Sequence, residues 1–169
     1  QRRRLRSLGY LGGGGPGPGS GDHPADLTGA VREADAARAA FRRGDFRAAA
    51  AAYRALVGRF PRSSLFWDEY GVALFLKGDR DDALRALKRS AALWPGNAPA
   101  WVHLGNALMA GDLRDEALAA YERAYASSPG NAEVLFNYGL ALRRVGRDGM
   151  ARQVWADFLK RYPNDPQAG

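Results

Sequence analysis

The chain has 169 residues, of which 46% are hydrophobic, and a net charge of +7. This length and composition allow one domain with a continuous core and require no second one. No apolar run approaches the ~18 residues that a membrane-spanning helix needs, and the absence of cysteine excludes disulfides and thiolate metal sites. The positive charge allows nucleic-acid binding, but the arginines are scattered among acidic residues, which favours an ordinary charged surface.

The first 24 residues carry no periodic pattern of a helix or strand. Residues 1–11 are basic and then apolar, but their apolar part is shorter than the ~7–15 residues of a signal peptide. Residues 12–24 are rich in Gly and Pro, which predicts a linker. The chain begins with Gln1 rather than Met, so we expect a processed protein or the tail of a longer polypeptide.

The segment LRSLGYLGG (Leu5 to Gly13) resembles the closing residues of bacterial sulfatase catalytic domains, some of which continue into helical repeats. This resemblance implies that residues 1–11 end an enzyme domain that this chain does not contain. It would place the chain in the periplasm or outside the cell; without it, a cytoplasmic location is expected. The family's nucleophile motif, Cys or Ser followed by x-Pro-x-Arg, is absent, so no sulfatase activity is implied for the chain itself.

From about Ala25 the sequence is helical and repetitive. Pro61, Pro95, Pro129 and Pro163 follow one another at intervals of 34 residues, and a fixed period of this size is typical of stacked repeats. Each repeat predicts one helix, a glycine turn and a second helix with a facing stripe of small and apolar residues. In the second repeat these residues are Trp67, Tyr70, Gly71, Leu74, Gly78, Ala83, Leu87 and Ala91.

The pattern W-x2-LG-x2-Y, followed by Ala, an aromatic residue and Pro, recurs over about residues 30–163 and resembles the tetratricopeptide repeat family. The resemblance implies an all-α fold, an α-solenoid of four helical hairpins. The expected domain spans residues 25–163, with repeats at about 30–63, 64–97, 98–131 and 132–165 and a short tail at 164–169. The implied function is protein–protein interaction.

Three departures from the pattern predict local differences. Glu33 replaces the expected Trp in the first repeat, which suits a terminal repeat that faces water on one side. Gly111 comes one position early, so we expect the first helix of the third repeat to end sooner. No further helix follows Pro163, so we expect Val154, Phe158 and Leu159 to be partly exposed and to favour self-association.

No arrangement of residues indicates catalysis, a cofactor or a metal. His23 and His103 are far apart in sequence and have no Cys beside them, so a surface role is favoured over metal binding. Asp79, Asp81 and Asp82 lack the Gly and Glu of a calcium loop and are better explained as stabilising a helix N-terminus. We therefore expect a protein that is not an enzyme.

The family resemblance implies that a peptide or protein segment binds in a concave groove lined by the first helix of each repeat. The expected lining residues are Arg38, Phe41, Arg42, Leu65, Asp68, Glu69, Val72, Phe75, Val102, His103, Asn106, Met109, Phe136, Asn137, Leu140 and Arg143. The alternative is that several apolar ones, such as Val72, Phe75, Val102 and Leu140, only pack neighbouring helices. Some family members clamp a C-terminal carboxylate with Lys and Asn. Here only Asn137 fits that role, so such a clamp is not expected.

Two other functions remain open at this stage. One is a non-catalytic extension of an upstream sulfatase-like domain in the same polypeptide. The other is nucleic-acid binding through Arg38, Arg42, Arg143, Arg144, Arg147 and Arg152, for which steep loss of binding with salt would indicate charge attraction alone.

Overall fold

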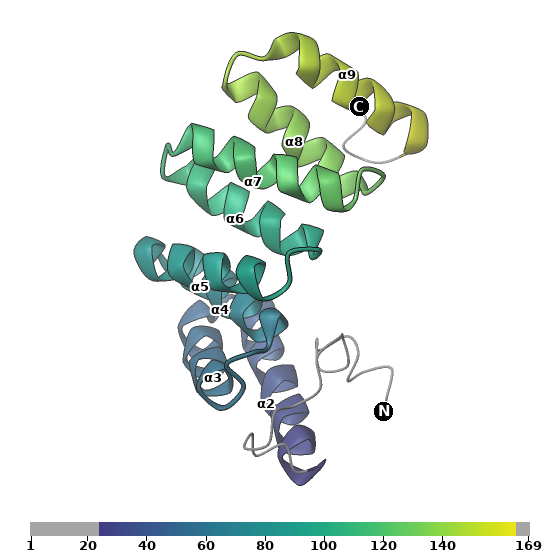
Figure 1. Ribbon diagram of the computed structural model, residues 1–169. Coiled ribbons are helices and arrows are strands. Elements are labelled where there is room, and N and C mark those ends of the chain that lie inside the picture. Colours follow the sequence, from purple (N-terminus) through teal and green to yellow (C-terminus); the bar gives the residue numbers. More distant parts are fainter. Residues whose placement is uncertain (1–23, 165–169) are drawn as a thin grey trace. The chain divides into compact units, whose positions relative to one another are not determined.

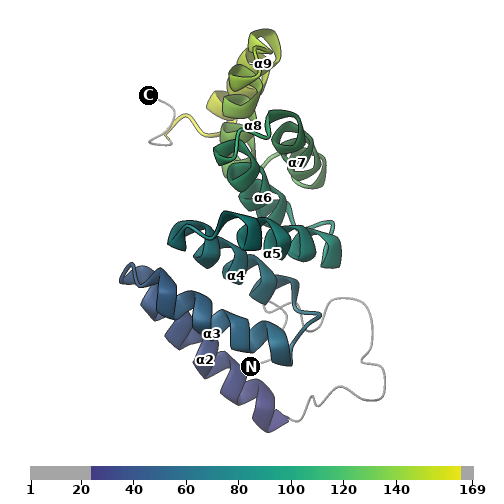
Figure 2. The same cartoon turned by 90° about the vertical axis from the view of Figure 1, so that its left-hand side faces the viewer.

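The computed structural model describes residues 24–164 (Figure 1). These residues form eight α-helices and no strand: α2 (Pro24–Arg42), α3 (Phe46–Arg59), α4 (Ser64–Lys77), α5 (Arg80–Leu93), α6 (Ala98–Ala110), α7 (Arg114–Ser127), α8 (Ala132–Arg144) and α9 (Asp148–Arg161). Consecutive helices pair into four hairpins (Figures 1 and 2). The predicted fold class, an all-α array of helical hairpins of the α-solenoid type, is confirmed.

The chain divides between Leu93 and Trp94 into two compact units. The first unit contains α2 to α5 and the second contains α6 to α9. Length and composition do not predict this division. Residues 1–23, with the predicted tail, the linker and the sulfatase resemblance, and residues 165–169 lie outside the described part. Within the described part, no helix is long and apolar enough to cross a membrane.

Every hairpin turns at a residue with left-handed backbone geometry. These residues are Gly44, Gly78, Asp112 and Gly146, each 34 positions after the one before. Glycine adopts this conformation freely because it has no Cβ, whereas Asp112, at a φ of 60°, does so at a cost. As predicted from the early Gly111, α6 ends at Ala110, one position before the counterpart of Lys77. The early glycine therefore leaves a non-glycine residue at the strained position.

Within the hairpins, glycines of the first helix let a large side chain of the second helix approach closely. A Cβ added at Gly105 would lie 2.8 Å from Cζ of Tyr121, which is closer than packed atoms come. The same relation holds for Gly71 with Leu87 and for Gly139 with Trp155. The first hairpin has Ala37 and Tyr53 at the equivalent positions. This packing brings a tyrosine of the second helix against the first helix in each unit.

An ion pair occupies the place of the missing Trp in the first repeat. The Glu33 carboxylate accepts a hydrogen bond of 2.7 Å from Nη1 of Arg59 on α3. Both side chains are exposed, which agrees with the expectation that this position tolerates a polar residue. The pair links α2 to α3 at the surface, where a Trp would instead have added apolar area.

The expected exposure of the last helix is wrong for Phe158. Its side chain is only 2% exposed, and its ring centroid lies 5.6 Å from that of Tyr162 and 6.1 Å from that of Phe136. The reason is that Tyr162, just after the helix, packs against the ring. Val154 is half-buried and Leu159 is exposed, so self-association through this end stays a prediction that rests on these two.

Candidate peptide-binding surfaces

In the first unit, the expected groove residues lie on α2 and α4. Most of them are half-buried, namely Arg38, Phe41, Leu65, Glu69, Val72 and Phe75, whereas Arg42 is exposed and Asp68 is buried. The rings of Phe41 and Phe75 and the side chain of Leu65 pack partly against the core of this unit. Only a part of each apolar side chain is therefore available to a ligand.

Three charged groups and a tyrosine meet on this face. The Arg38 guanidinium lies 3.5 Å from Asp35 and 3.5 Å from Glu69, so it links α2 to α4. The Tyr53 hydroxyl is buried beside Arg38 and Glu69 but makes no hydrogen bond of good geometry within the described chain. Burial first, and then the Glu69 carboxylate, raise the pKa of this hydroxyl well above its usual value. The hydroxyl therefore lies next to two groups that already pair with each other.

In the second unit, the expected groove residues lie on α6 and α8, which contact each other. The half-buried ones are His103, Asn106, Met109, Phe136, Asn137 and Leu140, whereas Arg143 is exposed and Val102 is buried. Carbon-rich and neutral polar side chains therefore dominate this face. It carries fewer charges than the face of the first unit.

Two amide side chains on this face are held in fixed orientations. The Tyr121 hydroxyl donates a hydrogen bond of 2.6 Å to Oδ1 of Asn106. Nδ2 of Asn137 donates one of 2.8 Å to the Glu133 carbonyl oxygen. Burial raises the pKa of Tyr121 to about 12, so its hydroxyl stays a donor at neutral pH. Asn106 therefore keeps a free N–H donor, and Asn137 keeps a free carbonyl acceptor, with respect to residues 24–164.

The structure corrects two expected lining residues. Asp68 is 6% exposed and Val102 is fully buried, so neither lines an open surface. They hold the same repeat position, 34 residues apart. This side of the first helices is packed by neighbouring helices, which is the alternative raised for Val102 from the sequence. The remaining expected residues keep some exposure, and whether they bind a ligand stays a prediction.

Half of the arginines named for nucleic-acid binding already have a partner. Arg38 is paired with acidic residues, and Arg147 lies 3.8 Å from Glu122. The Arg143 guanidinium lies over the Trp155 ring, 5.6 Å from its centroid. The other three, Arg42, Arg144 and Arg152, are exposed. Each lies on a different helix, Arg42 on α2, Arg144 on α8 and Arg152 on α9, so they do not form one continuous stripe along a helix.

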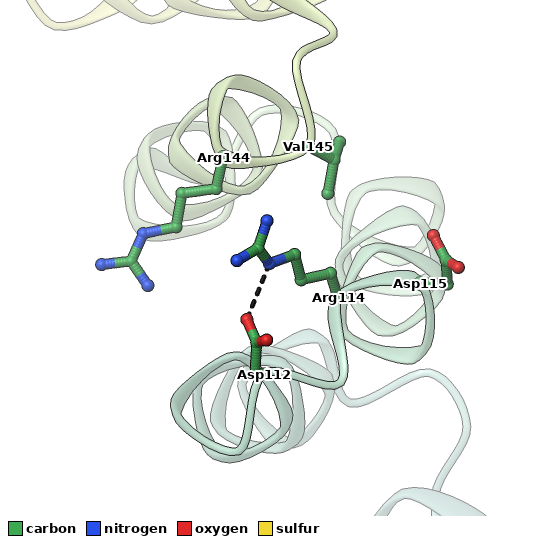
Figure 3. Close-up of a pocket in the computed structure, with 5 residues that line it drawn as sticks. All are labelled: Asp112, Arg114, Asp115, Arg144 and Val145. Atoms are coloured by element: carbon green, nitrogen blue, oxygen red, sulfur yellow. Dashed lines mark hydrogen bonds and ion pairs between the residues drawn. The ribbon is translucent and has the colours of Figure 1, made fainter.

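A shallow polar depression in the second unit lies away from the α6–α8 face. Figure 3 shows the Arg114 side chain directed toward its centre, while Arg144 extends to one side and Asp115 points away. Nε of Arg114 donates a 2.7 Å hydrogen bond to Asp112. Positive and negative side chains are equal in number among the lining residues, so the depression does not select an ion of either sign. No cluster of three potential metal-ligating side chains occurs in residues 24–164.

Tyr53 and Tyr121 are, in the sequence pattern, only the aromatic residue of the second helix. In the structure, the Tyr53 hydroxyl lies beside Arg38 and Glu69 in the first unit, and the Tyr121 hydroxyl bonds to Asn106 in the second. A signal for this was present, because Tyr53, Arg38 and Glu69 precede Tyr121, Asn106 and Asn137 by two full repeats. Comparing these positions would have shown a charged set in one unit and a neutral set in the other.

The sequence model of the tetratricopeptide repeat family matches residues 34–98, 74–131 and 102–166, most of the chain. No curated protein matches. A crystal structure of MamA protein superposes with a TM-score of 0.69 at 24% identity, covering 79% of this chain and 73% of that one. The structure of PilF of Pseudomonas aeruginosa superposes with a TM-score of 0.70 at 18% identity, covering 78% of this chain and 60% of that one. The first repeat domain of Spaghetti (RPAP3), solved with the HSP90 peptide SRMEEVD, superposes with a TM-score of 0.65 at 20% identity, covering 69% of this chain and 93% of that one. At these identities the likeness shows a shared fold alone.

Proposed function

Because this chain belongs to the tetratricopeptide repeat family, we propose that it is a protein-interaction module that binds an extended peptide segment on the α6–α8 face. The observation that carries the proposal is the pair of oriented amides. Asn106 offers an N–H group and Asn137 offers a carbonyl oxygen from two helices in contact. An extended peptide presents a C=O and an N–H group that would satisfy both.

Neighbouring side chains support a peptide over a small polar ligand. Met109 and Leu140 lie on the same two helices and are half-buried, so each offers apolar area to a side chain of the peptide. Methionine adapts to varied shapes because it is unbranched and flexible. The face thus combines main-chain hydrogen bonding with apolar anchoring.

The same face gives little support for binding a free C-terminal carboxylate. Such a ligand needs cationic donors, and the cation nearest in sequence, Arg143, lies over the Trp155 ring. The peptide therefore binds through internal main-chain groups. The complex with the HSP90 peptide belongs to a relative with the same fold and is no guide to the ligand here.

The first unit is the weaker candidate for this role. Its counterpart residues, Arg38 and Glu69, are engaged with each other, and a peptide would have to displace that pair. The extension of a sulfatase-like domain and nucleic-acid binding remain possible roles of the chain, but no contact in the described residues favours either.

The test is to select binders from a phage-displayed library of random peptides on the full chain and to measure the best one by calorimetry. We expect Asn106→Ala and Asn137→Ala each to weaken binding about fivefold to tenfold, the effect of about one hydrogen bond. Asn97→Ala is the matched control, because Asn97 lies before α6 and its side chain makes no capping hydrogen bond. Peptides that bind the two variants as tightly as the native chain would disprove the proposal.

A further inference from the structure

The second helix of the first repeat, α3, contains arginines but no acidic residue. Residues 46–67 contain four arginines and no Asp or Glu, whereas residues 80–101 and 114–135, the next two equivalents, contain two and four acidic residues. The acidic residues nearest to α3 are engaged. Oδ1 of Asp45 accepts a 2.9 Å hydrogen bond from the Ala48 N–H, and Glu33 is paired with Arg59.

The outer side of α3 carries basic residues separated by small ones. Arg47, Ala51, Arg54 and Gly58 are all exposed and fall at i, i+4, i+7 and i+11, a single face of a helix. We call this the α3 face. Because Ala51 and Gly58 are small, their side chains do not block access to the guanidinium groups of Arg47 and Arg54.

Two further arginines extend the charge at the ends of α3. Arg43 lies in the turn before the helix and Arg62 in the loop after it, and both are exposed. Neither these two nor Arg47 and Arg54 have a side-chain hydrogen bond or ion pair with any other residue between 24 and 164. Arg47 and Arg54 on the α3 face, with Arg43 and Arg62 at its two ends, are thus unpaired within the described residues.

A pair of aromatic rings lies at the start of the α3 face. Phe41, near the end of α2, and Phe46, the first residue of α3, meet edge to face with centroids 5.3 Å apart. Both side chains are half-buried, so part of each ring remains exposed beside Arg43 and Arg47. Aromatic rings next to basic side chains suit the boundary between lipid headgroups and acyl chains.

We propose that the α3 face adsorbs to an anionic lipid surface. Arg47 and Arg54 lie on one face of α3 and Arg43 comes just before it, so a flat bilayer can meet all three. The partly exposed rings of Phe41 and Phe46 favour a lipid surface over a nucleic-acid duplex, because only the bilayer offers an apolar layer beneath its charged headgroups. None of the four residues of the stripe is aromatic, so it offers no row of rings on which successive unpaired bases would stack. It also has no concave wall to enclose a peptide. The proposal concerns the first unit and does not depend on peptide binding by the second.

The test measures partitioning of the full chain onto phosphatidylcholine vesicles with and without one-fifth phosphatidylserine, by co-sedimentation. We expect binding only to the anionic vesicles, and weaker binding as salt rises. Each basic residue at such a surface contributes about fivefold to partitioning, so Arg43→Gln/Arg47→Gln/Arg54→Gln should lose about 100-fold. The control, Arg144→Gln/Arg147→Gln/Arg152→Gln, removes the same charge from the last hairpin. Residues 1–23 are unchanged in both, so any contribution they make is common to both.

The proposal stands if the α3 variant loses at least about fivefold more than the control and both keep the native thermal unfolding profile. A smaller difference overturns it, because binding would then follow net charge alone. Equal binding to neutral vesicles also overturns it. If the native chain ignores anionic vesicles but binds a DNA or RNA duplex through the same arginines, the partner is a nucleic acid and the membrane proposal fails.

Discussion

The two units place a tyrosine at the same point of the repeat but surround its hydroxyl with different chemistry. In the second unit, Tyr121 donates a 2.6 Å hydrogen bond to Asn106. In the first unit, Tyr53 is buried without a well-formed hydrogen bond beside Arg38 and Glu69, which pair with each other. Burial raises the pKa of both hydroxyls. Both stay protonated at neutral pH, but within the described residues only Tyr121 makes a well-formed hydrogen bond.

The difference teaches where the repeat constrains the sequence and where it does not. The 34-residue period fixes which positions are packed, since a glycine or alanine of the first helix and a bulky residue of the second occupy equivalent positions in every hairpin. The polar residues next to that contact vary. In the first unit they are charges that satisfy one another, and in the second they are amides with unused hydrogen-bonding groups. Binding chemistry therefore depends on the variable positions, while stability depends on the fixed ones.

The largest change in the free energy of unfolding is expected for Gly105→Ala. The new Cβ would lie 2.8–2.9 Å from three ring atoms of Tyr121, so the ring must shift and its bond to Asn106 is strained. Overpacking of this kind costs roughly 1–3 kcal/mol, and the gain in helix propensity returns about 1 kcal/mol, so we expect a net loss of up to about 2 kcal/mol. Urea unfolding measures the change.

Gly58→Ala is the control for this substitution. Gly58 is also inside a helix, but a Cβ there would meet nothing within 4 Å. We expect it to stabilise the chain by about 0.5–1 kcal/mol. If Gly105→Ala stabilised the chain as Gly58→Ala does, the close contact between α6 and α7 would not constrain the second unit. The glycine at position 105 and the alanine at its counterpart, Ala37, would then be interchangeable.

Removing the tyrosine hydroxyl in each unit tests directly whether the two hydroxyls differ in their hydrogen bonding. Tyr121→Phe removes a hydrogen bond to Asn106 and should destabilise the chain by about 1 kcal/mol. Tyr53→Phe removes a buried hydroxyl that makes no well-formed hydrogen bond, so it should be neutral or stabilise by up to about 1 kcal/mol. Both free energies of unfolding are measured at pH 7. Equal losses would mean that Tyr53 does have a hydrogen-bond partner in solution, and the two faces would then be alike.

Much of the fold follows from the sequence, because Pro61, Pro95 and Pro129 set the period and the glycine turns divide each repeat into two helices. The sequence also places most of the groove residues on the first helices. It fails for Val102, because the boundary between open and packed sides of a helix depends on where its neighbours lie. It fails for Phe158, because the cover comes from Tyr162, a residue outside the helix. Which polar groups pair, as Tyr121 does with Asn106, depends on distances that no spacing rule contains.

The smallest expected effect concerns the turns, which also differ between the units. The first unit turns at Gly44 and Gly78, whereas the second turns at Asp112 and Gly146. Asp112→Gly relieves a left-handed residue that carries a Cβ, so we expect a gain of about 0.5–1 kcal/mol in thermal or urea unfolding. The lost ion pair with Arg114 offsets little of this, because both side chains are largely exposed. Gly78→Asp creates the same strain in the first unit and should lose a similar amount. If both variants destabilised the chain, the aspartate would be contributing through its contact with Arg114, and the turn of the third hairpin would be adapted to it.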